Sequence, residues 1–285
     1  MSNSRTLKGR VVVVTGSSRG IGREIAIRAA ADGANVALLA RTDAPNPKIS
    51  GTLSETADAV QEAGGRALPL VCDVRDEDTV NRAIAAVDDA FGAIDVVVNN
   101  AGALDLRPTG KLPQKNFGRL LAVNVEGPFA VTQAALLLLR QSDNGHIVNV
   151  SPPLNLQPEW VGAHVGHTVG KYAESLLTLG WAAEFASIPI AVNSLWPATT
   201  VASTGMMVAM GEDAVRAQAR SPRIMADALH ALVTRSAGEC SGHFYTDEEV
   251  LREEGVDDLS GYRLAGRDED LTPNFYLSSS PLPKV

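Results

Sequence analysis

Residues 11–22 read VVVVTGSSRGIG, a run of valines that leads directly into three spaced glycines. The β-branched run between Gly9 and Gly16 predicts a buried strand, because both faces of a parallel strand are covered. From Ile21 the apolar residues recur at helical spacing until Gly33, which predicts a helix. A glycine-rich turn before a helix offers backbone N–H groups and the positive end of the helix dipole to a phosphate. This stretch therefore predicts a dinucleotide-binding unit.

The alternation of strand and helix patterns continues along the chain. Apolar runs at 36–39, 68–72, 94–98, 147–150 and 191–195 predict strands, and segments at 52–63, 117–140 and 164–185 predict helices. Pro69 cannot donate to a sheet ladder, so its run predicts an edge strand. Strands that alternate with helices in this way form parallel sheets. The sequence therefore predicts a doubly wound α/β fold, a Rossmann-type parallel sheet of about seven strands with helices on both faces.

Two segments interrupt this alternation. Residues 41–50 contain Pro45 and Pro47, which predicts a surface loop. After Thr246 the chain becomes acidic and reads EEVLREEGVDD at 248–258. We expect residues 1–246 to form a dinucleotide-binding catalytic domain, and residues 247–285 to form an acidic C-terminal tail packed on the same domain.

Composition argues against several other classes of protein. The formal net charge of −8 repels a phosphate backbone, so we expect no nucleic-acid partner. Apolar runs such as 134–139 are too short to cross a bilayer and the N-terminus has no apolar signal region, so we expect a cytoplasmic protein without a membrane span. Cys72 and Cys240 match no metal-ligand spacing and suit a reducing compartment.

Several separate motifs resemble those of one enzyme family. The turn Thr-Gly-x-x-x-Gly-Ile-Gly is joined by Asn-Asn-Ala-Gly at 99–102, Cys-Asp-Val at 72–74, Asn124 in VNVEGPF, Lys171 and the stretch 193–197. In order and spacing, residues 7–246 resemble the short-chain dehydrogenases/reductases, and HIVNVSPPLNLQPEW with AVNSLWPAT resembles their hydroxysteroid dehydrogenase-like 2 group. The resemblance implies an oxidoreductase with a nicotinamide cofactor. It implies these cofactor-binding residues: Gly16, Ser18, Arg19, Gly20, Ile21, Gly22, Arg41, Asp73, Val74, Asn100, Ala101, Gly102, Lys171 and Pro197.

The charge at the end of the second predicted strand bears on the choice of cofactor. NAD enzymes usually place an acidic residue there, which accepts a hydrogen bond from the ribose 2′-OH. This chain has Ala40 at that position, and Arg41 and Arg19 lie near the ribose in such a fold. A guanidinium suits a 2′-phosphate. Two solvated arginines are the alternative, but the pattern favours NADP(H) over NAD(H).

The resemblance also implies a catalytic Asn-Ser-Tyr-Lys tetrad, from which this chain departs at the tyrosine. Asn124 and Lys171 match, but the position four residues before Lys171 holds His167, and Tyr172 lies on another helix face. Histidine is an acid/base with a reference pKa of about 6.5, against about 10 for tyrosine. A neighbouring ammonium disfavours the imidazolium, and the shorter ring fits the tyrosine's geometry less well. We expect His167 to serve as the acid/base of a weakened or altered enzyme.

The serine of the tetrad is a second departure. The family's usual serine position holds Pro152, and counting thirteen residues back from His167 gives Leu154. Ser151 is the best candidate to orient a substrate oxygen, and a turn serine at a strand end is the alternative. His164 lies one turn from His167, but no third ligand is evident, so we expect no metal site.

The segment after Pro197 bears on the substrate. Met206, Met207, Val208 and Met210 suit an adaptable apolar pocket for a lipophilic alcohol, aldehyde or ketone, to which Trp160 and Trp196 could contribute. The alternative is that the methionines pack a short helix against the body. A protein that binds NADP(H) with little or no activity, as a sensor or a subunit of an assembly, is the rival function. The helices at 117–140 and 164–185 resemble the family's dimer contact and imply a homodimer or homotetramer.

Overall fold

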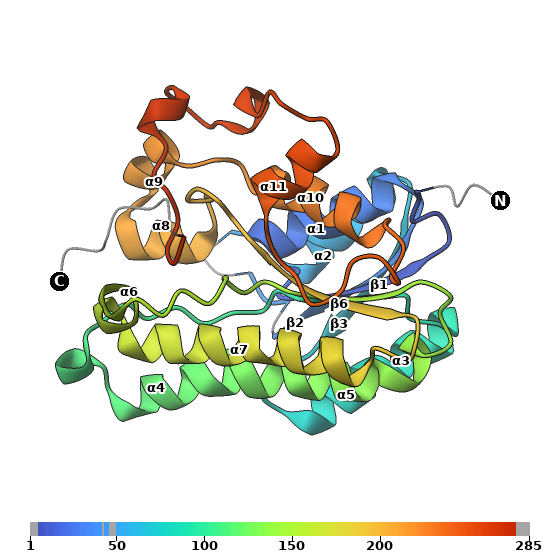
Figure 1. The fold of residues 1–285 in the computed structure, drawn as a ribbon. Coiled ribbons are helices and arrows are strands. Elements are labelled where there is room, and N and C mark those ends of the chain that lie inside the picture. Colours follow the sequence, from blue (N-terminus) through green and yellow to red (C-terminus); the bar gives the residue numbers. More distant parts are fainter. Residues whose placement is uncertain (1–4, 42, 46–49, 278–285) are drawn as a thin grey trace.

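The computed structural model describes residues 5–41, 43–45 and 50–277, and its centre is a seven-stranded parallel sheet (Figure 1). The strand order is β3-β2-β1-β4-β5-β6-β7, and every neighbouring pair is parallel. The strands are β1 (Val11–Thr15), β2 (Asn35–Ala40), β3 (Arg66–Val71), β4 (Val96–Asn99), β5 (Gly145–Asn149), β6 (Ile190–Trp196) and β7 (Phe244–Thr246). The predicted fold class is confirmed, and β3 with Pro69 lies at an edge as expected.

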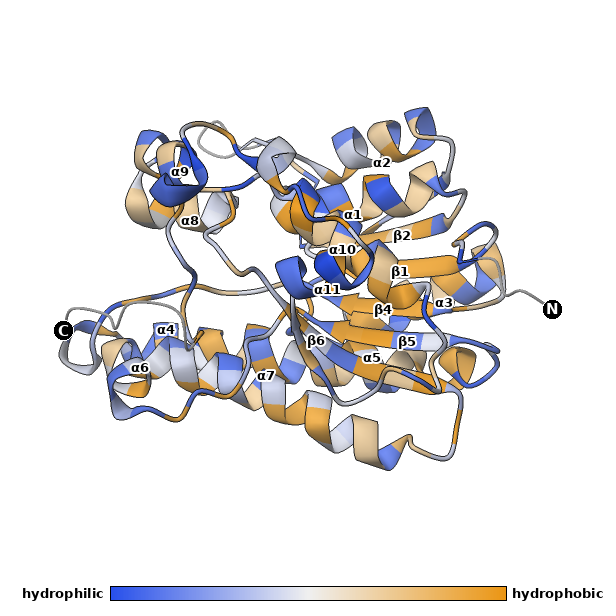
Figure 2. Cartoon of the chain, turned by 45° about the horizontal axis from the view of Figure 1, so that its top comes forward, coloured by the Kyte–Doolittle hydropathy of each residue, from blue (hydrophilic) through white to orange (hydrophobic). Residues whose placement is uncertain are grey.

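Helices cover both faces of the sheet, as the predicted doubly wound fold requires. One face carries α1 (Gly20–Ala31), α2 (Leu53–Glu62), α10 (Arg223–Val233) and α11 (Asp247–Glu253). The other carries α3 (Glu77–Phe91), α5 (Gly127–Leu139) and α7 (Val165–Glu184). Successive valines of β1 point to opposite faces, so Val12 and Val14 join one core cluster while Val11 and Val13 join the other. Figure 2 shows the hydrophobic strands enclosed between these layers.

Local sequence signals explain where the helices begin and end. Thr52 caps α2 in a capping box with Glu55, so the helix predicted at 52–63 begins and ends close to the expected residues. Asp76 caps α3, and Gly92 ends it in the left-handed conformation with φ of 68°.

The helix predicted at 117–140 consists of three parts. They are α4 (Gln114–Leu121), a π-helical segment η2 (Ala122–Glu126) and α5. A π-helical turn in a long helix is frequent at functional sites, and here it contains Asn124. By length and composition alone, Gln114–Leu139 could cross a membrane, but core helices of soluble proteins pass the same test. In this structure η2 and α5 pack against α7 and α3 respectively.

The chain after β7 returns to the body of the protein. Helix α11 packs on α10 through the buried Val250 and Leu251. Residues 271–277 then run beside β6, where the backbone N–H of Asn274 donates to the Ala198 carbonyl and the Trp196 indole donates to the Phe275 carbonyl. The proposed boundary at residue 246 falls at the end of β7. Residue 42 and residues 46–49 of the predicted loop, Pro47 among them, and 278–285 of the tail lie outside the described residues.

Shorter helices complete the structure around the carboxyl ends of the strands. They are α6 (Pro158–Ala163), α8 (Thr204–Met210) and α9 (Glu212–Gln218). In Figure 1, α8 and α9 lie above the end of the sheet where α6 and the start of α7 are also found. Ligands of such sheets bind at the carboxyl ends of the strands, so this end of the molecule holds the candidate site.

Candidate functional site

The glycine turn of residues 15–22 joins β1 to α1, as predicted. A Cβ on Gly16 would lie 2.9 Å from the Cα of Ala101, and one on Gly22 would lie 2.5 Å from Nδ2 of Asn100. Both glycines are therefore required by the close approach of the segment after β4. Gly20 has φ of 57°, in the left-handed region that favours glycine, and a Cβ there would lie 3.9 Å from the Cβ of Ser203. The turn has the shape of a cradle that side chains at these positions would fill.

The start of α1 is chemically suited to an anion. No side chain among the described residues caps this helix at Arg19, and its first turn carries no acidic residue. The N–H groups at a helix start then remain for a ligand, together with the dipole. The Asn100 side chain donates to the Thr15 carbonyl at 2.8 Å, and the Thr15 hydroxyl accepts from the N–H groups of Asn100 and Ala101. These bonds bring the predicted residues of the two segments together.

The predicted adenosine side lies at the ends of β2 and β3. Arg41 is exposed directly after β2, and Ala40 before it is buried. The Arg19 guanidinium donates to the Gly51 carbonyl at 3.0 Å, which directs it toward the same loop. Hydrogen bonds from Arg75 lower the pKa of Asp73, and Arg41 lowers it further. Two arginines therefore border this end of the site.

The predicted catalytic residues Asn124, His167 and Lys171 come from two adjacent helical segments. Segment η2 packs against α7, and all three side chains are buried. A Cβ on Gly102 would lie 3.7 Å from both Oδ1 of Asn124 and Nζ of Lys171. The segment after β4 therefore links the glycine turn to these residues. Pro197, also predicted here, follows β6, and its carbonyl accepts from the Asn274 side chain.

Asn124 fixes the backbone next to His167. Its Oδ1 accepts from the Ala103 N–H at 2.8 Å, and its Nδ2 donates to the Ala103 carbonyl at 3.0 Å. Such a two-way bond holds the backbone in one orientation. The same carbonyl lies close enough to the His167 ring to raise its pKa, so Asn124 acts on His167 through Ala103.

His167 is a neutral imidazole at neutral pH. Burial, and after it the Lys171 ammonium and His164, lower the pKa of His167 to about 3, while the Ala103 carbonyl and Asp105 oppose them. Nδ1 has no hydrogen-bond partner among the described residues. A neutral imidazole carries one N–H and one lone pair, so the ring can still accept a proton.

Lys171 has a partner that the sequence reasoning missed. Its Nζ donates to the Val150 carbonyl at 2.8 Å and to Oε2 of Glu174 at 2.7 Å. Glu174 is completely buried. An acid three residues after a lysine in a predicted helix was the available signal for this ion pair.

Ser151 stands at one end of a chain of side-chain hydrogen bonds near the carboxyl ends of the central strands. Its hydroxyl is 2.7 Å from that of Ser194, which is 2.8 Å from Thr178. Asn149 donates to Thr178 at 2.9 Å and accepts from Asn99 at 2.9 Å. The five side chains are buried, so the Ser151 hydroxyl is enclosed by protein.

Two other candidates near His167 have structural partners. The Tyr172 hydroxyl donates to the Asn155 carbonyl at 2.6 Å, and burial raises the pKa of Tyr172 to about 12. It therefore holds the loop after β5 and lies on another helix face, as the sequence indicated. Nδ1 of His164 is 2.7 Å from the Leu106 carbonyl. In the part of the chain that the structure describes, no group of three or more His, Cys, Asp or Glu side chains could hold a metal.

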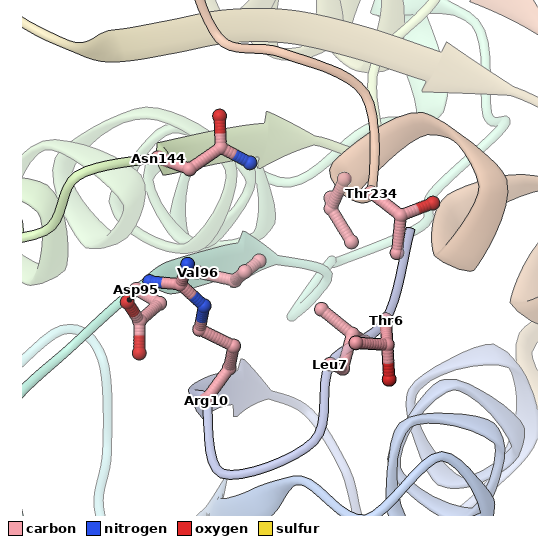
Figure 3. A pocket seen from close by; sticks show the side chains of 8 residues that line it. Thr6, Leu7, Arg10, Asp95, Val96, Asn144 and Thr234 are labelled. Atoms are coloured by element: carbon pink, nitrogen blue, oxygen red, sulfur yellow. Dashed lines mark hydrogen bonds and ion pairs between the residues drawn. The ribbon is translucent and has the colours of Figure 1, made fainter. Parts of the chain in front are cut away.

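Two described cavities lie at opposite ends of the sheet. One of about 1120 Å³ is lined by the loop after β5, the residues after β6, α11 and the segment 273–277. A second, shown in Figure 3, lies at the amino ends of β1, β4 and β5, where Arg10 pairs with Asp95 at 2.8 Å. It measures about 20 Å³, room for little more than one water. Only the first is large enough for an organic molecule.

The methionine segment packs partly against the body. Met206 and Met207 contact the small cluster of Ala202, Val215 and Ala219, whereas Val208 and Met210 are exposed. Helix α8 starts beside the glycine turn, since Ser203 lies 3.9 Å from the position of a Cβ on Gly20. The segment therefore borders the phosphate cradle.

The sequence matches a known enzyme family over most of its length. The model of the family described as short chain dehydrogenase matches residues 10–214. Hydroxysteroid dehydrogenase-like protein 2 of Xenopus laevis is 40% identical over 281 residues, which cover 99% of this chain and 66% of that protein. This chain thus spans less than two thirds of the length of that relative.

Solved structures share the fold. A protein from Xanthomonas campestris described as a dehydrogenase has a TM-score of 0.90 and 46% identity over 96% of this chain and 99% of that one. A metagenomic short-chain oxidoreductase in complex with NADP has a TM-score of 0.69 and 26% identity, over 84% of this chain and 97% of that one. A carveol dehydrogenase from Mycobacterium avium in complex with NAD, 21% identical with a TM-score of 0.73 over 84% and 96% of the chains, compares in fold alone.

Proposed function

The chain belongs to the short chain dehydrogenase family, and from this premise we propose that it is an NADP(H)-dependent oxidoreductase that interconverts a lipophilic alcohol and its aldehyde or ketone. The proposal rests on the segment after β4, which lies against both the glycine turn and the side chains of Asn124, His167 and Lys171. A dinucleotide site and an acid/base in contact are what alcohol–carbonyl chemistry with a nicotinamide requires.

The residues that would hold the cofactor fit it in shape and charge. The uncapped start of α1 and the turn at Gly16, Ser18, Gly20, Ile21 and Gly22 suit the pyrophosphate. The rest of the cofactor would lie between the adenosine side and the acid/base, against Asp73, Val74, Asn100, Ala101, Gly102, Lys171 and Pro197. When bound, the cofactor accepts or supplies the hydride.

The preference for NADP(H) rests on Arg19 and Arg41. Both border the end of β2, where Ala40 replaces the acid that would accept from a ribose 2′-OH. Guanidinium groups make strong, charge-assisted hydrogen bonds to phosphate. The family as a whole uses either cofactor, and these two side chains would decide between them here.

Proton transfer is assigned to His167. In alcohol oxidation, the unprotonated nitrogen of the His167 ring would accept the hydroxyl proton, while the hydride would pass from the carbon that bears this hydroxyl to the bound cofactor and leave a carbonyl. In the reverse direction the imidazolium would return that proton. Lys171 would hold the ribose with its remaining N–H, and Asn124 would keep the Ala103 carbonyl on the ring. Ser151 would orient the substrate oxygen only if its hydroxyl turned away from Ser194, and otherwise fixes the end of β5.

The substrate proposal rests on the apolar surface around the carboxyl ends of β5 and β6. The larger cavity contains Leu154, Leu156 and Leu277 beside Ala198, and the exposed Val208 and Met210 add apolar surface above the sheet. Exposed apolar side chains on α5 and α7, such as Leu137 and Leu176, support a homodimer or homotetramer. The acidic composition and two buried free thiols support a cytoplasmic location.

The rival function is an NADP(H)-binding protein with little or no turnover, a sensor or an assembly subunit. Specific observations favour it: His167 is buried and neutral, and the Ser151 hydroxyl is enclosed. Two measurements on one sample separate the functions. NADPH fluorescence titration tests binding, and NADPH oxidation over a panel of lipophilic aldehydes and ketones tests turnover. Binding with turnover supports the enzyme, binding without turnover supports the rival, and absence of binding contradicts both.

A further inference from the structure

Glu174 is a buried carboxylate that the reaction proposed above does not use. It is 0% exposed, its Oε2 lies 2.7 Å from Nζ of Lys171, and its Oε1 has no partner within the described ranges. A carboxylate without full hydrogen bonding is costly to bury, and a buried ion pair recovers this cost only in favourable geometry. Its position therefore requires a reason beyond packing.

Helix geometry places Glu174 in line with the acid/base. His167, Lys171 and Glu174 occupy positions i, i+4 and i+7 of α7, which share one helix face. Their exposed fractions are 3%, 7% and 0%. The face carries a proton acceptor, a cation and an anion in that order, enclosed from solvent.

The ion pair restricts where the Lys171 ammonium can point. Two of its three N–H donors are taken by the Val150 carbonyl and the Glu174 carboxylate, both from the interior side of the helix. One donor remains for a ribose hydroxyl. Without Glu174 the long lysine side chain could rotate among several directions, since its stem has four flexible carbons.

The ion pair also changes the charge that His167 experiences. The groups that act on its ring are Lys171 on the same helix, His164 at the helix start and Asp105 from the segment after β4. Lys171 is the charged group facing Glu174. An ammonium alone opposes the formation of an imidazolium, whereas an ammonium paired with a carboxylate opposes it much less.

We propose that Glu174 is a positioning residue, which fixes the Lys171 ammonium and supplies the countercharge that lets His167 accept a proton. This inference rests on the proposed function. It explains why an acid appears beside the lysine in a chain where histidine replaces tyrosine. A tyrosine gives up its proton more readily beside an unpaired ammonium, but a histidine takes one up more readily beside a neutralised ammonium.

The first test needs no turnover and uses Glu174→Gln, which removes the charge and keeps the shape. The matched control is Glu184→Gln, at the exposed end of the same helix. NADPH binding is titrated by fluorescence between pH 6 and pH 8, without substrate. Because burial raises the pKa of Glu174 to about 7, its protonation in this window should loosen Lys171 and weaken binding several-fold. This weakening of NADPH binding at lower pH should be seen in the original protein and in Glu184→Gln, and should be absent from Glu174→Gln.

The second test compares two backgrounds. Seven residues of helix separate His167 from Glu174 by roughly 10 Å, at which one charge moves a pKa by about one unit. With His167 present, Glu174→Gln should lower alcohol oxidation by about tenfold, and Glu174→Asp, which keeps the charge, should restore part of it. With His167→Tyr present, the same Glu174→Gln change should leave the rate equal or raise it. Thermal unfolding of each variant reports whether it is folded.

The role of Glu174 would be established if Glu174→Gln lowers the rate of alcohol oxidation when His167 is present and raises it, or leaves it equal, in the His167→Tyr protein. A similar loss in both backgrounds would overturn it, because a purely structural residue weakens either enzyme. If no variant turns over any alcohol or carbonyl, the proposed reaction is wrong, and the cofactor titration alone judges Glu174. Identical pH curves for the original protein and Glu174→Gln in that titration would then overturn the inference.

Discussion

The hydroxyls of Ser151 and Ser194 lie 2.7 Å apart at the carboxyl ends of β5 and β6. This contact ends a chain of six buried polar side chains that starts at Thr132, which accepts from Asn99. It ties neighbouring strands together where the candidate site lies. The residue in the serine position of the tetrad is thereby held by the sheet itself.

Ser151→Ala should therefore act mainly on stability. Removing one buried hydrogen bond costs roughly 1–2 kcal/mol of unfolding free energy, which urea unfolding measures, while turnover should change by less than about tenfold since the hydroxyl is enclosed. Ser175→Ala, which removes a hydroxyl bonded to the Pro152 and Lys171 carbonyls, is the comparison. A hundredfold loss of turnover with unchanged stability would show instead that Ser151 contacts the substrate.

His167→Tyr should raise carbonyl reduction by at least about tenfold. A phenol with a reference pKa of about 10 keeps a proton to donate at neutral pH, whereas burial lowers the pKa of His167 to about 3 and leaves only the very weakly acidic N–H of a neutral ring. The rate of NADPH oxidation measures the gain, and thermal unfolding detects strain from the larger ring. The neighbouring His164→Tyr serves as control. A slower His167→Tyr protein of normal stability would mean that His167 is the adapted acid/base.

Arg41→Ala should weaken NADPH binding by about ten- to a hundredfold, since hydrogen bonds to charged groups contribute roughly 1.5–3 kcal/mol. NADH binding should stay unchanged, because NADH has no 2′-phosphate. Arg140→Ala, another exposed arginine, controls for the loss of one positive charge. If Arg41→Ala weakens the binding of NADPH and NADH equally, Arg41 does not contact the 2′-phosphate.

Asp247→Asn should change how stability depends on pH. Burial raises the pKa of Asp247 from 3.8 to about 7, and its Oδ2 has no hydrogen-bond partner among the residues that the structure describes. The folded protein holds this proton more tightly than the unfolded chain, so the stability it contributes is complete below pH 4 and is lost as pH rises to about 7. Asparagine cannot titrate, so relative to the original protein the variant should gain stability between pH 4 and pH 7, by at most about 4 kcal/mol.

Urea unfolding across that range measures the difference between the two proteins. Asp89→Asn, at an exposed aspartate, should follow the original curve. Parallel curves for Asp247→Asn and the original protein would mean that the ionised carboxylate is tolerated where it is buried.

Much of the fold could be predicted because its signals are local. The valines of β1, the glycine turn and the helical spacing after Ile21 lie within a few residues of one another, and Pro69 marks the edge strand by itself. Strand β7 was not located, since three half-buried residues carry no periodic pattern. The π-helical segment around Asn124 was also missed, because a one-residue change in helical pitch leaves no trace in residue spacing.

The candidate site was predicted less completely because its chemistry depends on contacts between distant segments. The positions of Asn124, His167 and Lys171 follow from motif spacing, but their bonds to Ala103 and Val150 do not. The Ser151–Ser194 contact joins residues 43 positions apart. Glu174 was within reach of sequence reasoning, yet a Lys–Glu pair three residues apart is most often an exposed surface pair.

Tyr276 packs against two tryptophans, so the tryptophan fluorescence of this protein can report on the position of Tyr276. Its ring centroid lies 5.9 Å from Trp160 and 6.3 Å from Trp196, two of the three tryptophans in the chain, and its hydroxyl bonds Thr168, the residue after His167. Release of residues 271–277 would place both indoles in water. The intrinsic emission of the protein therefore reports, without any label, whether this segment is docked beside the catalytic helix, and a shift on adding a ligand would locate that ligand's effect.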